Sequence, residues 1–268
     1  PAVLMLRKYG IPQFQNYLQR AGITTINFPP EHYGLSLILG GAEATLWDVS
    51  GVYASMARVL NRYNRDFLYD EGDIHAPRLY QQEERHKVVD KPVLFHAGSV
   101  WHTMDAIKEL NRPDVTDWRI FSSSRKVGWK TGTSFGNRDA WAVGATPEYV
   151  VGVWVGNADG EGRPELTGVG YAAPVMFAVY NILPNTTWFA CPSKDFSAME
   201  ICPQSGFLRG KDCPRGESVM LYAPCAKSEP CPYHQIVHLS KDERYRVSEK
   251  CMSPLDMVHK PWFILLPQ

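Results

Sequence analysis

The residues best suited to chemistry form one short run, Lys130-Thr131-Gly132-Thr133-Ser134. A lysine ammonium attracts a ligand carboxylate, and threonine hydroxyls can donate hydrogen bonds to the same group. Glycine lets a ligand backbone approach closely, and an edge strand can pair with an extended peptide. Taken alone, Lys-Thr-Gly is short enough to recur by chance and favours an ordinary strand end with an exposed lysine. Its flanking segments decide between these two interpretations.

The cysteines are the second chemical feature, because residues 1–190 contain none and all six lie between Cys191 and Cys251. This density is typical of a disulfide-stapled module from an oxidising compartment. The alternative is zinc, since Cys231-Pro-Tyr-His234 and His238 resemble a ligand cluster, but the Cys-x-x-Cys pairs of most structural zinc sites are missing. We therefore expect disulfides, no metal and no organic cofactor. The predicted pairs are Cys202–Cys213, Cys231–Cys251 and Cys191–Cys225.

Composition excludes several classes of protein. The 268 residues carry 28 basic and 28 acidic side chains, so the formal net charge is zero and gives no electrostatic footprint for nucleic acid. Hydrophobic residues make up 44% of the chain, as in an ordinary globular protein. The longest apolar runs, Tyr149–Val155 and Phe263–Leu266, are strand-sized and too short to span a membrane.

The elements that must position Lys130 are several helices, then one sheet, then a last helix. Residues 1–22 predict two short helices divided at Gly10, and Thr45 begins a helix to about Leu60. Residues 61–98 are polar and irregular, and Ser99 begins a helix to about Leu110.

Alternating small and branched residues then predict a three-strand antiparallel meander, which a helix over 171–183 follows. The fold class is therefore α+β. We expect a domain over 1–185 and a Cys-rich, mostly irregular extension over 186–268, with short strands such as Ile236–Leu239. The turn after the first strand contains Asp139, for which we favour an ordering role over ligand binding. The three predicted strands are Lys126–Thr133, Ala140–Thr146 and Tyr149–Val155.

Longer segments around the Lys-Thr-Gly run resemble, in the same order, the transpeptidase domain of class A penicillin-binding proteins. The resemblance covers about residues 1–185, and the Cys-rich tail looks most like the 1C branch of that family. The segments that carry it are Lys130–Ser134, Asn137–Gly144, Tyr149–Asn157, Tyr33–Thr45, Leu166–Gly168 and Ala172–Pro174.

The resemblance implies a partial penicillin-binding/β-lactamase-like fold and a role in peptidoglycan cross-linking by serine acyl transfer. Lys130 and Thr133 would be catalytic, and Lys130, Thr131, Gly132, Thr133 and Ser134 would bind substrate. Lys130 would set the electrostatics of the substrate carboxylate, both threonine side chains would hold it, and the Thr133 N–H would complete the oxyanion hole. Partners would be D-Ala-D-Ala stem peptides, lipid-linked precursor and β-lactams, at the periplasmic face of a bacterial inner membrane.

Two further motifs of the family differ here. No Ser-x-Asn occurs in the chain, and Pro1-Ala2-Val3 resembles the stretch that follows that motif, so we expect a fragment that is inactive alone. The one Ser-x-x-Lys string, Ser123–Lys126, lies directly before Lys130, whereas the family nucleophile opens a helix far upstream. We interpret it as fortuitous. Alternatives are a D,D-carboxypeptidase or β-lactamase on the same fold, and a non-catalytic peptidoglycan- or protein-binding scaffold.

Overall fold

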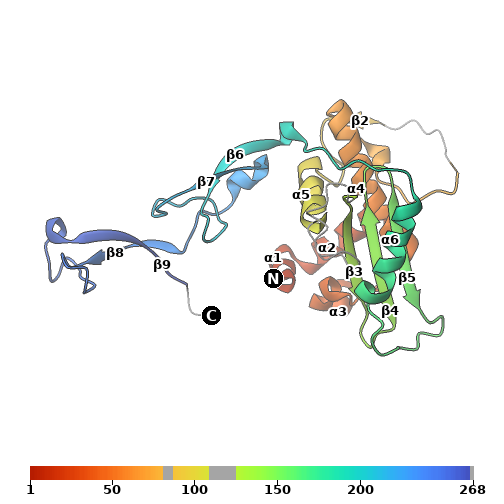
Figure 1. Cartoon of the computed structure of the whole chain (residues 1–268), viewed down its shortest axis with the longest axis horizontal. Helices are drawn as coiled ribbons and strands as arrows, with labels where there is room; N and C mark the ends of the chain where they lie inside the picture. Colours follow the sequence, from red (N-terminus) through yellow and green to blue (C-terminus); the bar gives the residue numbers. More distant parts are fainter. Residues whose placement is uncertain (81–86, 109–124, 266–268) are drawn as a thin grey trace. The chain divides into compact units, whose positions relative to one another are not determined.

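The computed structural model describes residues 1–80, 87–108 and 125–265. The chain divides into two compact units, Pro1–Pro192 and Ser193–Gln268 (Figure 1). The division falls later than residue 185, because Phe189 is buried in the core of the first unit and Trp188 packs against the same core.

A three-stranded antiparallel sheet lies at the centre of the first unit, as the sequence predicts. Its order is β3-β4-β5, with Lys130 opposite Val143 and Thr133 opposite Ala140. The strands are β3 (Gly128–Thr133), β4 (Asp139–Ala145) and β5 (Val150–Gly156).

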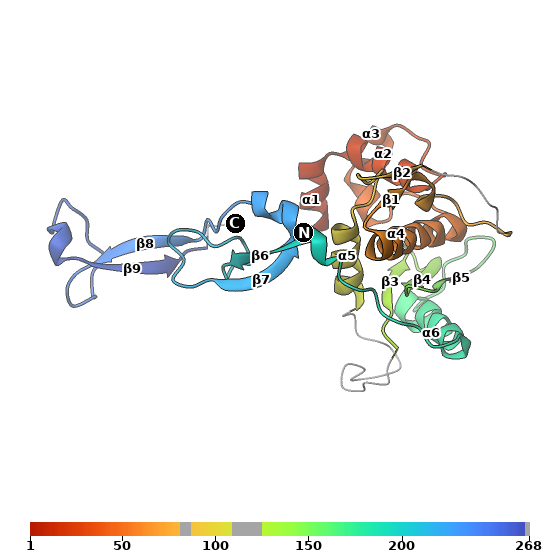
Figure 2. The ribbon, with the colours of Figure 1, turned by 90° about the horizontal axis from the view of Figure 1, so that it is seen from above.

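Helices cover both faces of this sheet. Figure 2 shows α6 (Ala173–Ile182) on one face, with α4 (Leu46–Asp66) and α5 (Ala97–Lys108) on the other. The helices lie so close that a Cβ at Gly144 would come within 2.9 Å of Met176 Sδ, and a Cβ at Gly152 within 2.3 Å of Ser50 Oγ. The run of small residues in β4 and β5 is therefore a packing requirement of a sheet buried on both faces.

Two helix boundaries of the first unit lie where the sequence predicts them, at Gly10 and Thr45. Gly10, at φ 101°, separates α1 (Ala2–Tyr9) from α2 (Ile11–Ala21). Thr45 caps α4 by accepting from the Asp48 N–H at 3.0 Å, but α4 runs beyond Leu60 to Asp66, and α5 begins before Ser99. Shorter elements are α3 (Pro30–Tyr33), 3₁₀ turns at Gly34–Leu39 and Glu71–Asp73, and the paired strands β1 (Tyr69–Asp70) and β2 (Val88–Val89).

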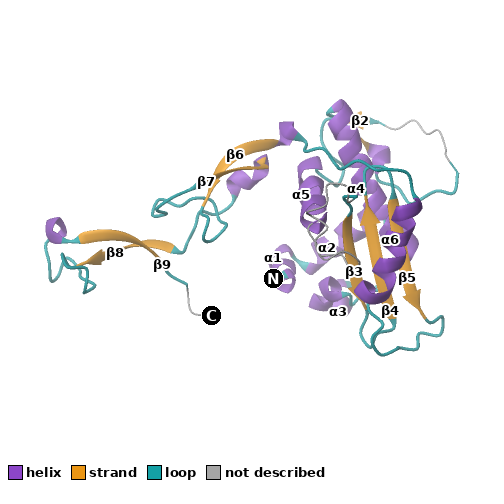
Figure 3. Ribbon diagram, in the orientation of Figure 1, coloured by secondary structure: helices purple, strands orange, loops and turns teal. Residues whose placement is uncertain are grey.

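The second unit is more regular than its sequence suggests. It contains two antiparallel hairpins, and the strand expected at Ile236–Leu239 is part of β8 (Figure 3). The sequence did not predict the other three strands. Each of them buries few side chains, so apolar and polar residues alternate only weakly along it. The elements are β6 (Phe196–Ile201), β7 (Glu217–Tyr222), β8 (His234–Leu239) and β9 (Val258–Phe263), with 3₁₀ turns at Ser193–Asp195, Ala223–Lys227 and Pro254–Asp256.

None of the predicted disulfides is formed in the structure, where all six cysteines have free thiols. Cys202, Cys213 and Cys231 converge on one imidazole, that of His234, instead of pairing. Cys251 is exposed, and its Sγ donates to the Ser248 carbonyl oxygen at 3.2 Å.

Asp48 connects the start of α4 to the segment that follows α2. One carboxylate oxygen accepts from the Thr24 backbone N–H at 2.9 Å and from the Thr24 hydroxyl at 2.6 Å. Burial raises the pKa of Asp48, but these hydrogen bonds to the charged form outweigh it, so the pKa lies below its ordinary value. The ionised form therefore stabilises the fold.

We predict that Asp48→Asn lowers the free energy of unfolding at pH 7 by about 1–3 kcal/mol, because two charge-assisted hydrogen bonds weaken. The folded pKa is depressed, so this stabilisation is present above about pH 4 and is lost as the pH falls through the folded pKa. Urea unfolding of both proteins at several pH values should show the difference shrinking in acid. Exposed Asp90→Asn is the control, and a pH-independent difference would contradict the assignment.

Candidate active site

The Lys-Thr-Gly run lies at the end of β3, which forms one edge of the described sheet. Trp129 fixes the first half of the strand in the core, because its buried ring packs edge-on against Phe177 of α6 with ring centroids 5.1 Å apart. The next residues emerge from the core: Lys130 and Thr133 are exposed. An edge strand presents unpaired backbone groups to an extended ligand. The position therefore suits recognition of a peptide.

Side chains of β3 alternate between the two faces of the sheet. Thr131 faces the same side as Trp129, toward the α6 layer, whereas Lys130 shares the face of Gly128, which packs against Met104 of α5. One carboxylate can thus contact Lys130 and a threonine together only at the open edge between the faces. The ammonium of Lys130 already lies along its own strand, where it donates to the Thr131 carbonyl oxygen at 2.6 Å.

Thr133 is oriented by a segment that the site prediction did not include. The Gly168 backbone N–H donates to Thr133 Oγ1 at 3.0 Å, which leaves the hydroxyl hydrogen of Thr133 available for a ligand. Gly168 can lie there only as glycine: a Cβ would stand 2.5 Å from the carbonyl oxygens of Gly132 and Trp141. The sequence signal for this contact was Leu166–Gly168, one of the segments that resemble the family.

The turn after β3 is held internally. Ser134 Oγ accepts from the Asp139 N–H at 2.8 Å, and Asp139 Oδ1 accepts from Trp154 Nε1 at 2.8 Å. Asn137, at φ 53°, donates from its side chain to the Leu166 carbonyl oxygen at 2.9 Å and so ties the turn to the Gly168 segment. Ser134 and Asp139 therefore shape the turn, and Ser134 is less suited to substrate than Lys130 is.

The Ser-x-x-Lys string contributes no described nucleophile, because Ser123 and Ser124 lie outside the described residues. The two described residues of the string, Arg125 and Lys126, have no nucleophilic role. Arg125 donates to the carbonyl oxygens of Tyr180 and Leu183 at the end of α6, and Lys126 is exposed. The geometry at β3 can bind and polarise a peptide carboxylate, but it does not by itself supply an attacking atom.

Comparison with known proteins decides the family. The chain is 33% identical over 185 residues to penicillin-binding protein 1C of Escherichia coli K12, covering 68% of this chain and 21% of that protein. The chain is homologous to the class A penicillin-binding proteins. Penicillin-binding protein 1B of Vibrio cholerae is 28% identical over 178 residues, 65% of this chain and 22% of that protein. No family model matches the chain.

The structure agrees with this homology at the level of fold. It superposes on the crystal structure of penicillin-binding protein 1A from Haemophilus influenzae with a TM-score of 0.51 and 19% identity, over 86% of this chain and 39% of that one. The chain thus corresponds to part of the penicillin-binding transpeptidase region and spans about a fifth to a quarter of the curated relatives it matches.

One further group among the described residues could hold a metal. It lies in the second unit and consists of Cys202, Cys213, Cys231 and His234. Disulfide reasoning from the sequence had divided these cysteines between two pairs.

We predict that Gly168→Ala destabilises the chain by about 1–3 kcal/mol, because the added methyl group must push the segment away from two backbone carbonyls. The Gly168–Thr133 hydrogen bond would break with it. Chemical denaturation measures the loss, and exposed Val169→Ala in the same segment is the matched control. An unfolding midpoint for Gly168→Ala equal to that of the wild-type chain would show that the close approach is not formed in solution.

Proposed function

We propose that this chain carries the carboxylate-binding part of a serine-type D-Ala-D-Ala transpeptidase, within a bifunctional enzyme that also polymerises glycan. The observation that carries the proposal is the Lys130–Thr133 run on an exposed edge strand, oriented from one side by Gly168. Homology to class A penicillin-binding proteins supports the same assignment.

In this proposal the stem peptide pairs with the outer edge of β3 and places its terminal carboxylate between the two faces of the strand. The Lys130 ammonium leaves the Thr131 carbonyl and neutralises that carboxylate. The hydroxyl of Thr133, whose oxygen already accepts from Gly168, donates its hydrogen to the same group. The Thr131 hydroxyl adds a second donor, and the backbone N–H of Thr133 faces the carbonyl oxygen that becomes negative on attack.

The chemistry would be acyl transfer in two steps. A serine hydroxyl attacks the D-Ala-D-Ala carbonyl carbon, a base takes the hydroxyl proton and passes it to the leaving nitrogen, and the peptide C–N bond breaks to release D-alanine. The amine of a second stem peptide then attacks the ester and frees the serine, so a new amide replaces the old one. β-Lactams would acylate the same serine. We place this serine in a part of the protein outside the present sequence, which contains no Ser-x-Asn.

The same proposal places the enzyme at the periplasmic face of the inner membrane, with lipid-linked precursor as its other substrate. Among the described residues, no helix combines the length and the apolar character that a membrane crossing requires. The rival function is a non-catalytic scaffold that binds peptidoglycan or protein without forming an acyl-enzyme. Covalent labelling distinguishes the two, because a scaffold takes no penicillin adduct.

We predict that Lys130→Ala in the full-length protein slows acylation by a fluorescent penicillin about 10²–10³-fold, because the substrate carboxylate loses its cation. Gel fluorescence against time gives the rate. Lys126→Ala, which removes a neighbouring exposed lysine outside the strand, should stay within about twofold of the wild type. Equal rates for the two variants would refute the role of Lys130, and a complete absence of labelling in the wild type would favour the scaffold.

A further inference from the structure

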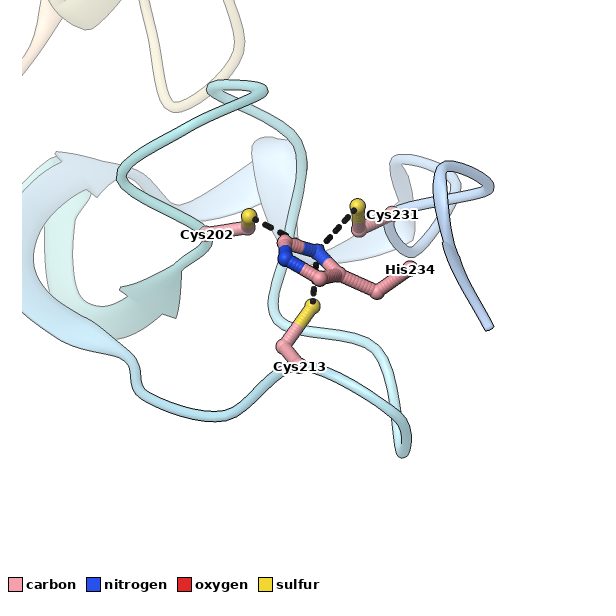
Figure 4. Close-up of side chains that lie close together, drawn as sticks. All are labelled: Cys202, Cys213, Cys231 and His234. Atoms are coloured by element: carbon pink, nitrogen blue, oxygen red, sulfur yellow. Dashed lines mark hydrogen bonds between the residues drawn. The ribbon is translucent and has the colours of Figure 1, made fainter. Parts of the chain in front are cut away.

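We infer that the second unit contains a structural zinc site formed by Cys202, Cys213, Cys231 and His234. All four side chains are buried, with relative exposures of 0%, 4%, 8% and 6%. Their ligand atoms all lie within 4.8 Å of one another (Figure 4). Three soft sulfurs and one imidazole nitrogen form a donor set that selects zinc, as in Cys₃His sites.

The distances have the size of a zinc tetrahedron. His234 Nδ1 lies 3.5 Å from Cys202 Sγ and 3.4 Å from the Sγ atoms of Cys213 and Cys231. Zn–S bonds of about 2.3 Å and a Zn–N bond of about 2.0 Å at tetrahedral angles separate sulfur from nitrogen by about 3.5 Å. Figure 4 shows the three sulfurs arranged around the edge of one ring that carries this nitrogen.

Hydrogen bonding alone does not account for the arrangement. A neutral imidazole nitrogen has one in-plane lone pair and accepts one hydrogen bond, so three thiols cannot all donate to His234 Nδ1. A disulfide between any two of the sulfurs does not account for it either, since it would not explain why all three sulfurs lie 3.4–3.5 Å from His234 Nδ1. A central cation satisfies all four ligands at once, and its binding releases the thiol protons to solvent.

Neighbouring residues donate hydrogen bonds to two of the sulfurs. The Ser205 hydroxyl donates to Cys231 Sγ at 3.2 Å. The Gly210 N–H donates to Cys213 Sγ at 3.3 Å. Such second-layer hydrogen bonds fix metal ligands and offset the negative charge of the thiolates. The four ligands come from the chain itself and are closed to solvent, which indicates a structural site rather than a catalytic one.

The cluster also supplies what the core of this unit lacks. Apart from its members, the buried described residues of the second unit are Phe196, Val237, Ser240 and Met257. So few apolar side chains rarely hold a small unit together without a metal or disulfides. Zinc would join the turns after β6 to the beginning of β8, where His234 is the first residue.

The test is the metal content of the whole chain, purified without chelator and measured by inductively coupled plasma mass spectrometry. We expect about one zinc per chain, falling below about a tenth in Cys213→Ser and unchanged in Cys251→Ser, which removes an exposed cysteine of the same unit. His238→Ala is the matched control for His234→Ala. Metal-free protein after refolding with zinc, or wild-type zinc content in Cys213→Ser, would overturn the inference.

A second measurement needs no variant and so does not depend on whether a variant folds. Native alkylation of the wild-type chain, followed by peptide mapping, should leave Cys202, Cys213 and Cys231 protected and modify Cys251. After removal of zinc with a strong chelator, the three protected cysteines should react as well. Alkylation of all three before chelation, or a disulfide between any two of them, would contradict the zinc site.

Discussion

Burial of the central strand β4 on both faces is the constraint on which the first unit depends. Helix α6 packs on one face of the sheet so closely that Gly144 of β4 has no room for a side chain, and α4 packs as closely on the other face at Gly152 of β5. The hydrogen-bonded order β3-β4-β5 places β4 in the middle, under both helical layers, and leaves β3 at an edge of the described sheet. Trp129 is held in the core, so the strand emerges from it at Lys130. The candidate site is thus a consequence of core packing.

The second constraint acts at the site. Because side chains alternate along β3, Lys130 and Thr133 lie on opposite faces and share only the strand edge, and Gly168 supplies the hydrogen bond that orients the threonine hydroxyl. Over its described residues, the second unit lacks such a hydrophobic core. Its hairpins bury little apolar surface, and half of its buried residues are three cysteines and a histidine. The first unit therefore has a packed hydrophobic core, whereas the second has few buried apolar side chains around a cluster of three cysteines and a histidine.

Much of the first unit could be predicted from its sequence, since strong local signals agree with the fold. Gly10 and Thr45 mark helix ends, and the small and branched residues of 126–156 mark the meander. The helix end at Asp66 could not be located, because burial of Tyr63 by tertiary packing extends α4 past the polar residues that suggested a stop. The role of Gly168 depends on a contact with β3 across 35 residues, which spacing alone does not reveal. The convergence of Cys202, Cys213 and Cys231 on His234 could not be predicted, because the three cysteines come from separate turns, and Cys231-Pro-Tyr-His234 was the one local sign of the cluster.

The central claim is that this chain binds the carboxylate of an acyl donor and that the attacking serine lies in another part of the protein. Intact mass spectrometry of the isolated 268-residue chain after incubation with a penicillin tests it most directly. The account predicts no covalent adduct on this chain and a single adduct on the full-length protein. A single penicilloyl adduct on the isolated chain, at Ser123 or any other serine within it, would contradict the account.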